Sequence, residues 1–119
     1  MKIYIAASFP RKNEANELAS RLGGQGHDVI SQWHEQDSEY GGGELPARAE
    51  RDLCDIADCD ILVSLTGDDL SHGGRHGEVG AALAYGKEVC IVGPREMVFH
   101  HHETVQVFSN VDAFLGYVR

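Results

Sequence analysis

The sequence contains few basic residues, with 10 Lys and Arg against 19 Asp and Glu and a formal net charge of −9. This balance argues against a nucleic-acid partner, because binding a polyanion requires a basic surface. It does not exclude a small anion, since a few donors at a helix N-terminus can hold one phosphate group despite an acidic surface.

Long apolar runs are also absent. No stretch approaches the roughly 20 apolar residues of a membrane-spanning helix. The N-terminal segment MKIYIAASF is too short for a signal peptide, and the residues after it are too polar. The three cysteines (Cys54, Cys59 and Cys90) are odd in number and lack metal-type spacing. We therefore expect reduced thiols in a cytoplasmic protein without a membrane partner.

Internal repeats and interdomain linkers are absent as well, so we expect one domain over residues 1–119. A chain of this length buries about two-thirds of its unfolded surface. Its composition, 42% hydrophobic and 24% charged, is ordinary for a globular protein.

Strand-like and helix-like segments alternate along the chain. We expect strands over residues 2–6, 27–33, 60–65, 88–93 and 104–108. We expect helices over residues 8–24, 45–59, 73–87 and 110–118. The alternation predicts a three-layer, doubly wound α/β fold in which helices cover both faces of a five-stranded parallel sheet.

Local patterns refine three of the helices. The first has Pro10 at its first position and the apolar spacing Ala15, Leu18, Ala19 and Leu22. The second has an inward stripe of Leu53, Ile56 and Ala57, and the last is capped by Asn110. The segment 34–44 has no period and three consecutive glycines, which is typical of a loop or lid.

Residues 67–80, GDDLSHGGRHGEVG, are the most informative stretch. A buried strand leads into a glycine-rich loop and then into a helix that carries Glu78 near its start. Open α/β sheets bind their ligands in such strand–loop–helix units. The pair Gly73 and Gly74 allows a ligand to approach the backbone, and the helix N-terminus favours an anion. We expect a phosphate group here, with the Glu78 carboxylate close to the ligand.

A metal site is the weaker interpretation of the same loop. His72 and His76 are four residues apart near two aspartates, which permits zinc binding only if the loop is helical. The intervening glycines disfavour a helix. For the internal triplet 100–102, HHH, we expect a loop that packs near a neighbouring chain. No metal or organic cofactor is expected.

Three segments, KIYIA, RDLCDIADCDILVSL and GGRHGEVGAALAYGKEV, resemble the nucleoside 2-deoxyribosyltransferase family and its relatives, the 2′-deoxynucleoside 5′-phosphate N-hydrolases. The segment GPREMVFHHHETVQVF also resembles a group of bacterial and phage proteins placed in that family. The resemblance spans nearly the whole chain, and its most specific part is the spacing from Asp52 to Glu78. It implies a flavodoxin-like (Rossmann-like) fold, a homo-oligomer of at least two chains, and cleavage of an N-glycosidic bond.

The resemblance also implies roles for individual residues. Glu78 takes the place of the nucleophile, Tyr4 that of the tyrosine which orients it, and Asp52 that of the aspartate which handles the nucleobase. The family takes one residue from a neighbouring chain near the last strand. Glu103 and Thr104 both fall there, and the choice between them stays open.

The loop before Glu78 departs from the transferase pattern. His72 stands where the transferases have an acidic residue, and Ser71 lies beside the position where the phosphate-accepting hydrolases have a serine. With Arg75 as a cationic donor, these changes favour a nucleoside 5′-monophosphate over a free nucleoside. We also expect Ser8 in the binding site, although it is equally suited to a helix cap. Trp33 either stacks on a base or lies at the edge of the core.

The expected reaction has Glu78 attack C1′ and form a glycosyl-enzyme, from which the sugar passes to water or to a second base. Simpler interpretations remain for each residue: Glu78 as a favourable acid near a helix N-terminus, Asp52 in a surface pair with Arg48, and Tyr4 as packing.

Other functions also remain open. A non-catalytic nucleotide-binding or sensing module on the same fold is the main alternative. The loop GGRHGE also resembles that of the phosphoribohydrolases that release cytokinin-type bases. Those proteins are longer, and their loop has a Pro and a Thr that this one lacks. A flavodoxin-like electron carrier is disfavoured, because no Ser/Thr-rich loop follows the first strand.

Overall fold

Five parallel strands form one sheet in the order β2-β1-β3-β4-β5, in a computed structural model that describes residues 1–39, 44–69 and 73–119. The strands are β1 (Lys2–Ala6), β2 (Asp28–Val29), β3 (Ile61–Leu65), β4 (Glu88–Val92) and β5 (Gln106–Phe108). The doubly wound α/β fold predicted from the alternating pattern is confirmed.

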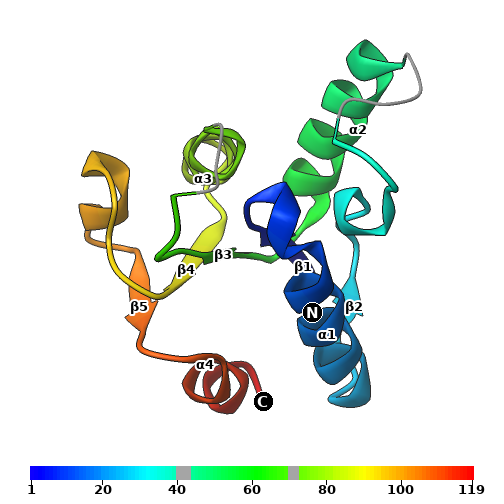
Figure 1. Cartoon of the computed structure of the whole chain (residues 1–119). Helices are drawn as coiled ribbons and strands as arrows, with labels where there is room; N and C mark the ends of the chain where they lie inside the picture. Colours follow the sequence, from blue (N-terminus) through cyan, green and yellow to red (C-terminus); the bar gives the residue numbers. More distant parts are fainter. Residues whose placement is uncertain (40–43, 70–72) are drawn as a thin grey trace.

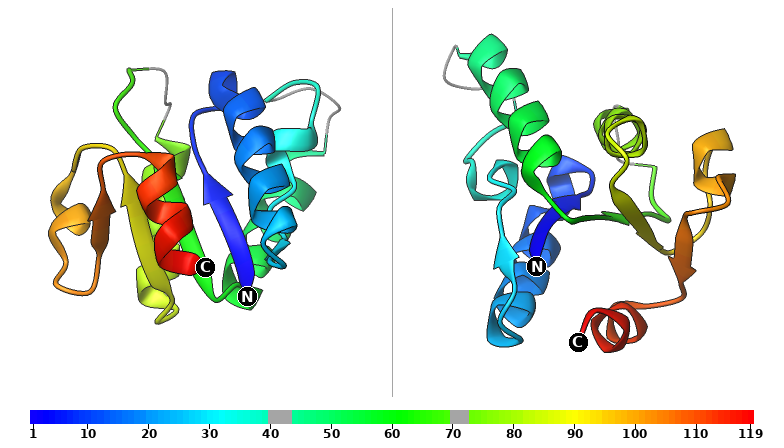
Figure 2. Two further views of the ribbon diagram at one scale, coloured as in Figure 1. Left: turned by 90° about the horizontal axis from the view of Figure 1, so that it is seen from below. Right: turned by 180° about the vertical axis from the view of Figure 1, so that it is seen from behind.

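Helices cover both faces of the sheet, as Figures 1 and 2 show. The helices α1 (Lys12–Gly24) and α4 (Val111–Val118) lie on one face, and α2 (Leu45–Asp58) and α3 (Gly74–Ala84) on the other. Short 3₁₀ turns are η1 (Phe9–Arg11), η2 (Trp33–Glu35) and η3 (Val98–His101). The central strands β1 and β3 are therefore covered on both sides, which explains their continuous apolar sequences.

Packing of α1 and α4 agrees with the sequence pattern. Ala15, Leu18 and Leu22 of α1 are buried against the sheet. Asn110 caps α4, because its side-chain oxygen accepts a hydrogen bond from the Ala113 amide at 2.9 Å. The three cysteines are free thiols, of which Cys54 is exposed.

Three predicted boundaries are wrong. The second strand pairs with β1 only at Asp28 and Val29, because the chain turns at Trp33 into η2. The fifth strand begins at Gln106 instead of Thr104. Pro10 lies in η1, and α1 begins at Lys12.

The predicted inward stripe of α2 is also largely wrong. Ile56 is its only fully buried residue, while Leu53 is 46% exposed and Ala57 is exposed. Figure 1 shows the reason: the end of α2 near Leu45 extends away from the sheet. The residues of α2 that face α3 therefore line an open space instead of the core.

Among the described residues, no helix is long and apolar enough to cross a membrane.

Candidate active site

A cavity of about 480 Å³ lies between α2 and α3, beside the chain that leaves β1. Strands β1 and β3 are neighbours here, and their onward connections run to opposite sides of the sheet. Ligands of open α/β folds bind at such a switch point. The lining residues are Ala7, Ser8, Phe9, Trp33, Gln36, Glu39, Leu45, Arg48, Ala49, Asp52, Leu53, Ile56, Gly74, Arg75, Gly77 and Glu78.

Tyr4 and Glu78 are joined at the base of this cavity. The Tyr4 hydroxyl donates a hydrogen bond to Oε2 of Glu78. Tyr4 is fully buried in β1, and Glu78 is partly buried in the second turn of α3. A strand and a helix thus hold the hydroxyl and the carboxylate against each other, and the roles that the resemblance implies for them stay predictions.

The environment of Glu78 favours its protonated form. Burial raises the pKa of Glu78 to about 8, the Tyr4 hydrogen bond opposes this rise, and the charge of Asp52 adds to it. Burial, followed by the charges of Glu78 and Asp52, raises the pKa of the Tyr4 hydroxyl above its usual range. Tyr4 therefore stays a hydrogen-bond donor, and the proton that titrates belongs to Glu78.

Asp52 reaches the same cavity from the opposite wall, on α2. Burial raises its pKa, whereas the hydrogen bond and charge of Arg51 lower it. In place of the alternative surface pair with Arg48, Asp52 forms an ion pair with Arg51 at 3.0 Å. Two carboxyl groups on facing helices, each with a raised pKa, can divide acid and nucleophile roles between them.

The glycines at the start of α3 leave its backbone accessible. Gly73 is the N-cap residue with a φ of +97°, a left-handed conformation that favours glycine. A Cβ atom at Gly74 or Gly77 would meet no other atom within 4 Å. Both residues line the cavity, so the space beside them is not filled by side chains of the other described residues. A ligand can therefore approach the α3 backbone here.

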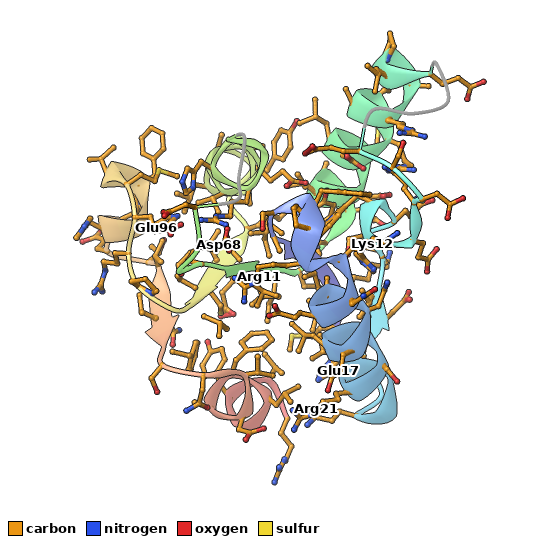
Figure 3. The ribbon with its side chains drawn as sticks, viewed as in Figure 1. Arg11, Lys12, Glu17, Arg21, Asp68 and Glu96 are labelled. Carbon is orange, nitrogen blue, oxygen red and sulfur yellow. The ribbon has the colours of Figure 1, made fainter. Side chains whose placement is uncertain are left out.

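Arg75 is buried below this turn, at 2% side-chain exposure. It forms ion pairs with Asp68 at 3.0 Å and Glu96 at 2.6 Å, while Arg11 also binds Asp68 at 2.8 Å. Figure 3 shows Arg11, Asp68 and Glu96 following one another across the carboxyl ends of the strands. The Nη atoms of Arg75 thus already bind carboxylates, and its predicted role in phosphate binding stays a prediction.

Ser8 and Trp33 both line the cavity. Ser8 is 4% exposed and is the N-cap residue of η1, but its side chain makes no cap hydrogen bond, and its Oγ has no hydrogen-bond partner among the described residues. Trp33 is nearly buried, and its indole N–H donates to the carbonyl of Ile5 at 2.6 Å. Trp33 therefore belongs to the edge of the core, and base stacking by its cavity-facing surface stays a prediction.

The other predicted residues are Ser71, His72, Glu103 and Thr104, of which Glu103 and Thr104 do not line this cavity. Ser71 and His72 lie outside the described residues. Glu103 and Thr104 are exposed between η3 and β5. Their contribution to a neighbouring chain stays a prediction.

One histidine of the internal triplet differs from the expected loop, whereas His101 and His102 are exposed and their packing near a neighbouring chain stays a prediction. His100 is fully buried within this chain, in η3, and its Nδ1 accepts the amide of Glu96 at 2.9 Å. Its ring lies edge-on to that of His76. Over the described residues, no group of His, Cys, Asp and Glu side chains has an arrangement that would hold a metal ion.

Sequence reasoning missed Gln36 and Arg51. Gln36 lines the cavity directly after η2, in the segment treated only as a loop. Arg51 stands beside Asp52 in the sequence, and that adjacency was the available signal.

The chain matches no protein-family model and no curated protein. Solved structures do match. It is 24% identical to a 2-deoxyribosyltransferase from Bacillus psychrosaccharolyticus, with 98% of this chain and 92% of that one covered and a TM-score of 0.76. A CMP N-glycosidase from Clostridium botulinum gives 18% identity, 99% and 98% coverage and a TM-score of 0.70. A 2-desoxiribosyltransferase from Leishmania mexicana is 16% identical, with 98% of this chain and 95% of that one covered and a TM-score of 0.67. The resemblance seen in the sequence is thereby confirmed at the level of the fold.

Proposed function

We propose that the protein cleaves the N-glycosidic bond of a (2′-deoxy)nucleoside or its 5′-monophosphate, with Glu78 as nucleophile. The observation that carries the proposal is the hydrogen bond from the fully buried Tyr4 to Glu78, which lines a cavity together with Asp52. Proteins of the same fold are an N-glycosidase and two deoxyribosyltransferases, which supports the same class of bond.

In the first step an oxygen of ionised Glu78 attacks C1′ of the sugar. The C1′–N bond breaks, its electron pair moves to the base nitrogen, and Asp52 in its acid form supplies a proton to the base. In the second step water attacks C1′ and gives a proton to the Asp52 carboxylate, while the bond from C1′ to Glu78 breaks, so that the sugar leaves and the Glu78 carboxylate is regenerated. A second nucleobase in place of water gives a new nucleoside, which is the transferase outcome.

A 5′-monophosphate is the substrate form that the site favours. The buried hydroxyl of Ser8 has no partner within residues 1–39, 44–69 and 73–119, and a Cβ atom at Gly73 or Gly74 would meet no atom within 4 Å there. Both supply donors for a phosphate oxygen, and the helix dipole adds to the attraction. No cofactor participates in this scheme.

We also propose that the chain acts as a homo-oligomer. Val98 and Phe99 are adjacent in η3 and are 75% and 54% exposed. A contiguous exposed apolar patch favours an interface. Sedimentation equilibrium of the whole protein tests this: a monomer at micromolar concentration contradicts it.

The test of the proposed function is free-base release, followed by chromatography, from a panel of deoxy- and ribonucleosides and their 5′-monophosphates. Wild type, Glu78→Ala and Glu78→Gln are compared, with Glu17→Gln on the exposed surface of α1 as the matched control. Loss of the nucleophile is expected to reduce the rate by roughly a thousandfold or more.

Each outcome of that panel has a definite meaning. Base release that depends on Glu78 supports an N-glycosidase, and turnover only in the presence of a second base identifies a transferase. Near-normal turnover in Glu78→Ala contradicts the assignment of the nucleophile. Ligand binding without release from any substrate favours the nucleotide-binding module instead.

A further inference from the structure

Arg51 forms a bridge between two residues of the cavity wall without lining the cavity itself. Its Nε and Nη2 atoms lie 3.2 Å and 3.0 Å from Oδ1 of Asp52. The same Nη2 lies 2.5 Å from Oε1 of Gln36. One guanidinium thus joins α2 to the segment that follows η2.

This contact fixes the orientation of the Gln36 amide. An arginine has only hydrogen-bond donors, so the atom of Gln36 that it meets must be the carbonyl oxygen. The Gln36 backbone is held separately, because its carbonyl accepts Nζ of Lys12 at 2.9 Å. In the part of the chain that the structure describes, no hydrogen bond engages the amide N–H₂ group, so this end of Gln36 is available to a ligand.

The contact with Arg51 also makes the two carboxyl oxygens of Asp52 different from each other. Both bonds from Arg51 go to Oδ1. Among the described residues, no hydrogen bond reaches Oδ2. Asp52 thus keeps one oxygen for a ligand while Arg51 occupies the other.

We propose that Arg51 is a positioning residue of the base-binding wall: it presents Asp52 through Oδ2 and Gln36 through its amide N–H₂ group. This pair offers a carboxyl oxygen beside an amide donor, which complements a nucleobase edge with adjacent hydrogen-bond donor and acceptor atoms. The base-binding part of the inference depends on the proposed function, whereas the bridge itself does not.

Lysine cannot replace arginine in this role, because an ammonium group lacks the planar fork that reaches two acceptors in fixed directions. The electrostatic setting of Asp52 involves other groups as well. On its own helix these are Arg48 and Asp55, from β1 Tyr4, and from α3 Glu78. Arg51 affects the pKa of Asp52 more than Asp55 and Arg48 do, and it lowers this pKa, whereas burial raises it.

The first test needs no substrate. The side-chain carboxyl carbon of Asp52, assigned with Asp52→Asn, is titrated by NMR in the full-length protein. We compare wild type, Arg51→Met and the control Arg21→Met, which removes an exposed ion pair with Asp112 on the other face of the sheet. Arg51→Met is expected to raise the pKa of Asp52, and Arg21→Met to leave it unchanged. An unchanged Asp52 titration in Arg51→Met overturns the proposal.

The second test uses base release. Arg51→Met and Arg51→Lys are expected to reduce kcat/KM by about tenfold to a hundredfold, the scale of a misplaced contact group. The limb of the pH profile that follows Asp52 is expected to move to higher pH in Arg51→Met. A role in folding alone would lower Tm without moving that limb. If wild type releases no base, the proposed function fails, and the NMR titration still decides whether Arg51 controls Asp52.

Discussion

The Tyr4 hydroxyl in the middle of β1 donates a hydrogen bond to the Glu78 carboxylate in α3, 74 residues later in the chain. Tyr4 pairs in register with Leu62 of β3, so the donor is fixed at the centre of the sheet. Because burial and the nearby carboxyl groups disfavour its ionisation, Tyr4 keeps its proton and donates a hydrogen bond to the Glu78 carboxylate. This contact therefore both aims Glu78 and stabilises its ionised form.

Replacing Tyr4 with phenylalanine is expected to move the pH dependence of the reaction. The nucleophile must be ionised, so kcat/KM for base release is expected to rise with pH around a midpoint of about 8 in wild type. The lost hydrogen bond opposed the rise in the pKa of Glu78, so the midpoint is expected at higher pH in Tyr4→Phe. Tyr117→Phe is the matched control, because Tyr117 also binds a glutamate, Glu88, outside the cavity. An equal midpoint in both variants contradicts this prediction.

The Glu78→Gln variant is expected to be more stable than wild type at alkaline pH. Glu78 has a pKa of about 8 when folded against 4.5 ordinarily, so the unfolded chain loses this proton first. Between these values the stability of wild type falls as pH rises, and above about 8 it levels off. Glutamine does not titrate, so the free energy of unfolding of Glu78→Gln rises relative to that of wild type between pH 4.5 and about 8. The difference grows by about 1.4 kcal/mol per pH unit.

Urea unfolding at pH 5, 7 and 9, followed by the fluorescence of Trp33, measures this difference. Trp33 is the single tryptophan and is nearly buried, so its emission reports the core. A constant difference between the two proteins over this range would mean that Glu78 has an ordinary pKa.

A methyl group at Gly77 is expected to raise the stability of the protein while it weakens substrate binding. The position is helical and open, so Gly77→Ala is expected to stabilise α3 by up to about 1 kcal/mol. The same methyl enters space beside the cavity, so KM is expected to rise several-fold. Gly116→Ala in α4 has equal room on the other face of the sheet and is the control. An unchanged KM in Gly77→Ala would show that no substrate approaches α3 there.

Ser8→Ala is expected to leave stability equal or slightly higher. A buried hydroxyl without a partner carries a desolvation cost on the order of 1 kcal/mol, which alanine removes. If Ser8 binds the substrate, kcat/KM falls more for a 5′-monophosphate than for its free nucleoside. Thermal unfolding and the two substrate forms measured side by side check both parts, with the exposed Ser20→Ala as control. A clear loss of stability in Ser8→Ala contradicts the structural part.

The sequence predicted the sheet well because strongly apolar segments left little choice. The runs that became β1, β3 and β4 are buried on both faces, and their composition indicates this directly. The stripe of α2 was misassigned for a physical reason: a helix that borders a cavity carries the same apolar spacing as one that packs on a sheet. Leu53 and Ile56 therefore look alike in sequence, although only Ile56 is buried.

The centre of the site was predictable because its residues lie in the segments that carry the resemblance. Tyr4, Asp52 and Glu78 followed from the resemblance, and the structure brings all three together at the cavity. The ion pairs of Arg75 were not predictable, because its partner Glu96 comes from a distant loop after β4. Gln36 was missed because a segment without periodicity gives no indication of which side chains turn inward.

Ile56 is the one buried residue of α2, so folding depends little on the other α2 side chains that shape the cavity. Six residues of α2 line the cavity, and only Ile56 among them also belongs to the core. Substitutions at positions such as Leu45, Ala49 and Leu53 can thus accumulate without disturbing the sheet or the Tyr4–Glu78 contact. One helix surface is then free to diversify during evolution, or in a mutant library, while the reactive centre is inherited unchanged.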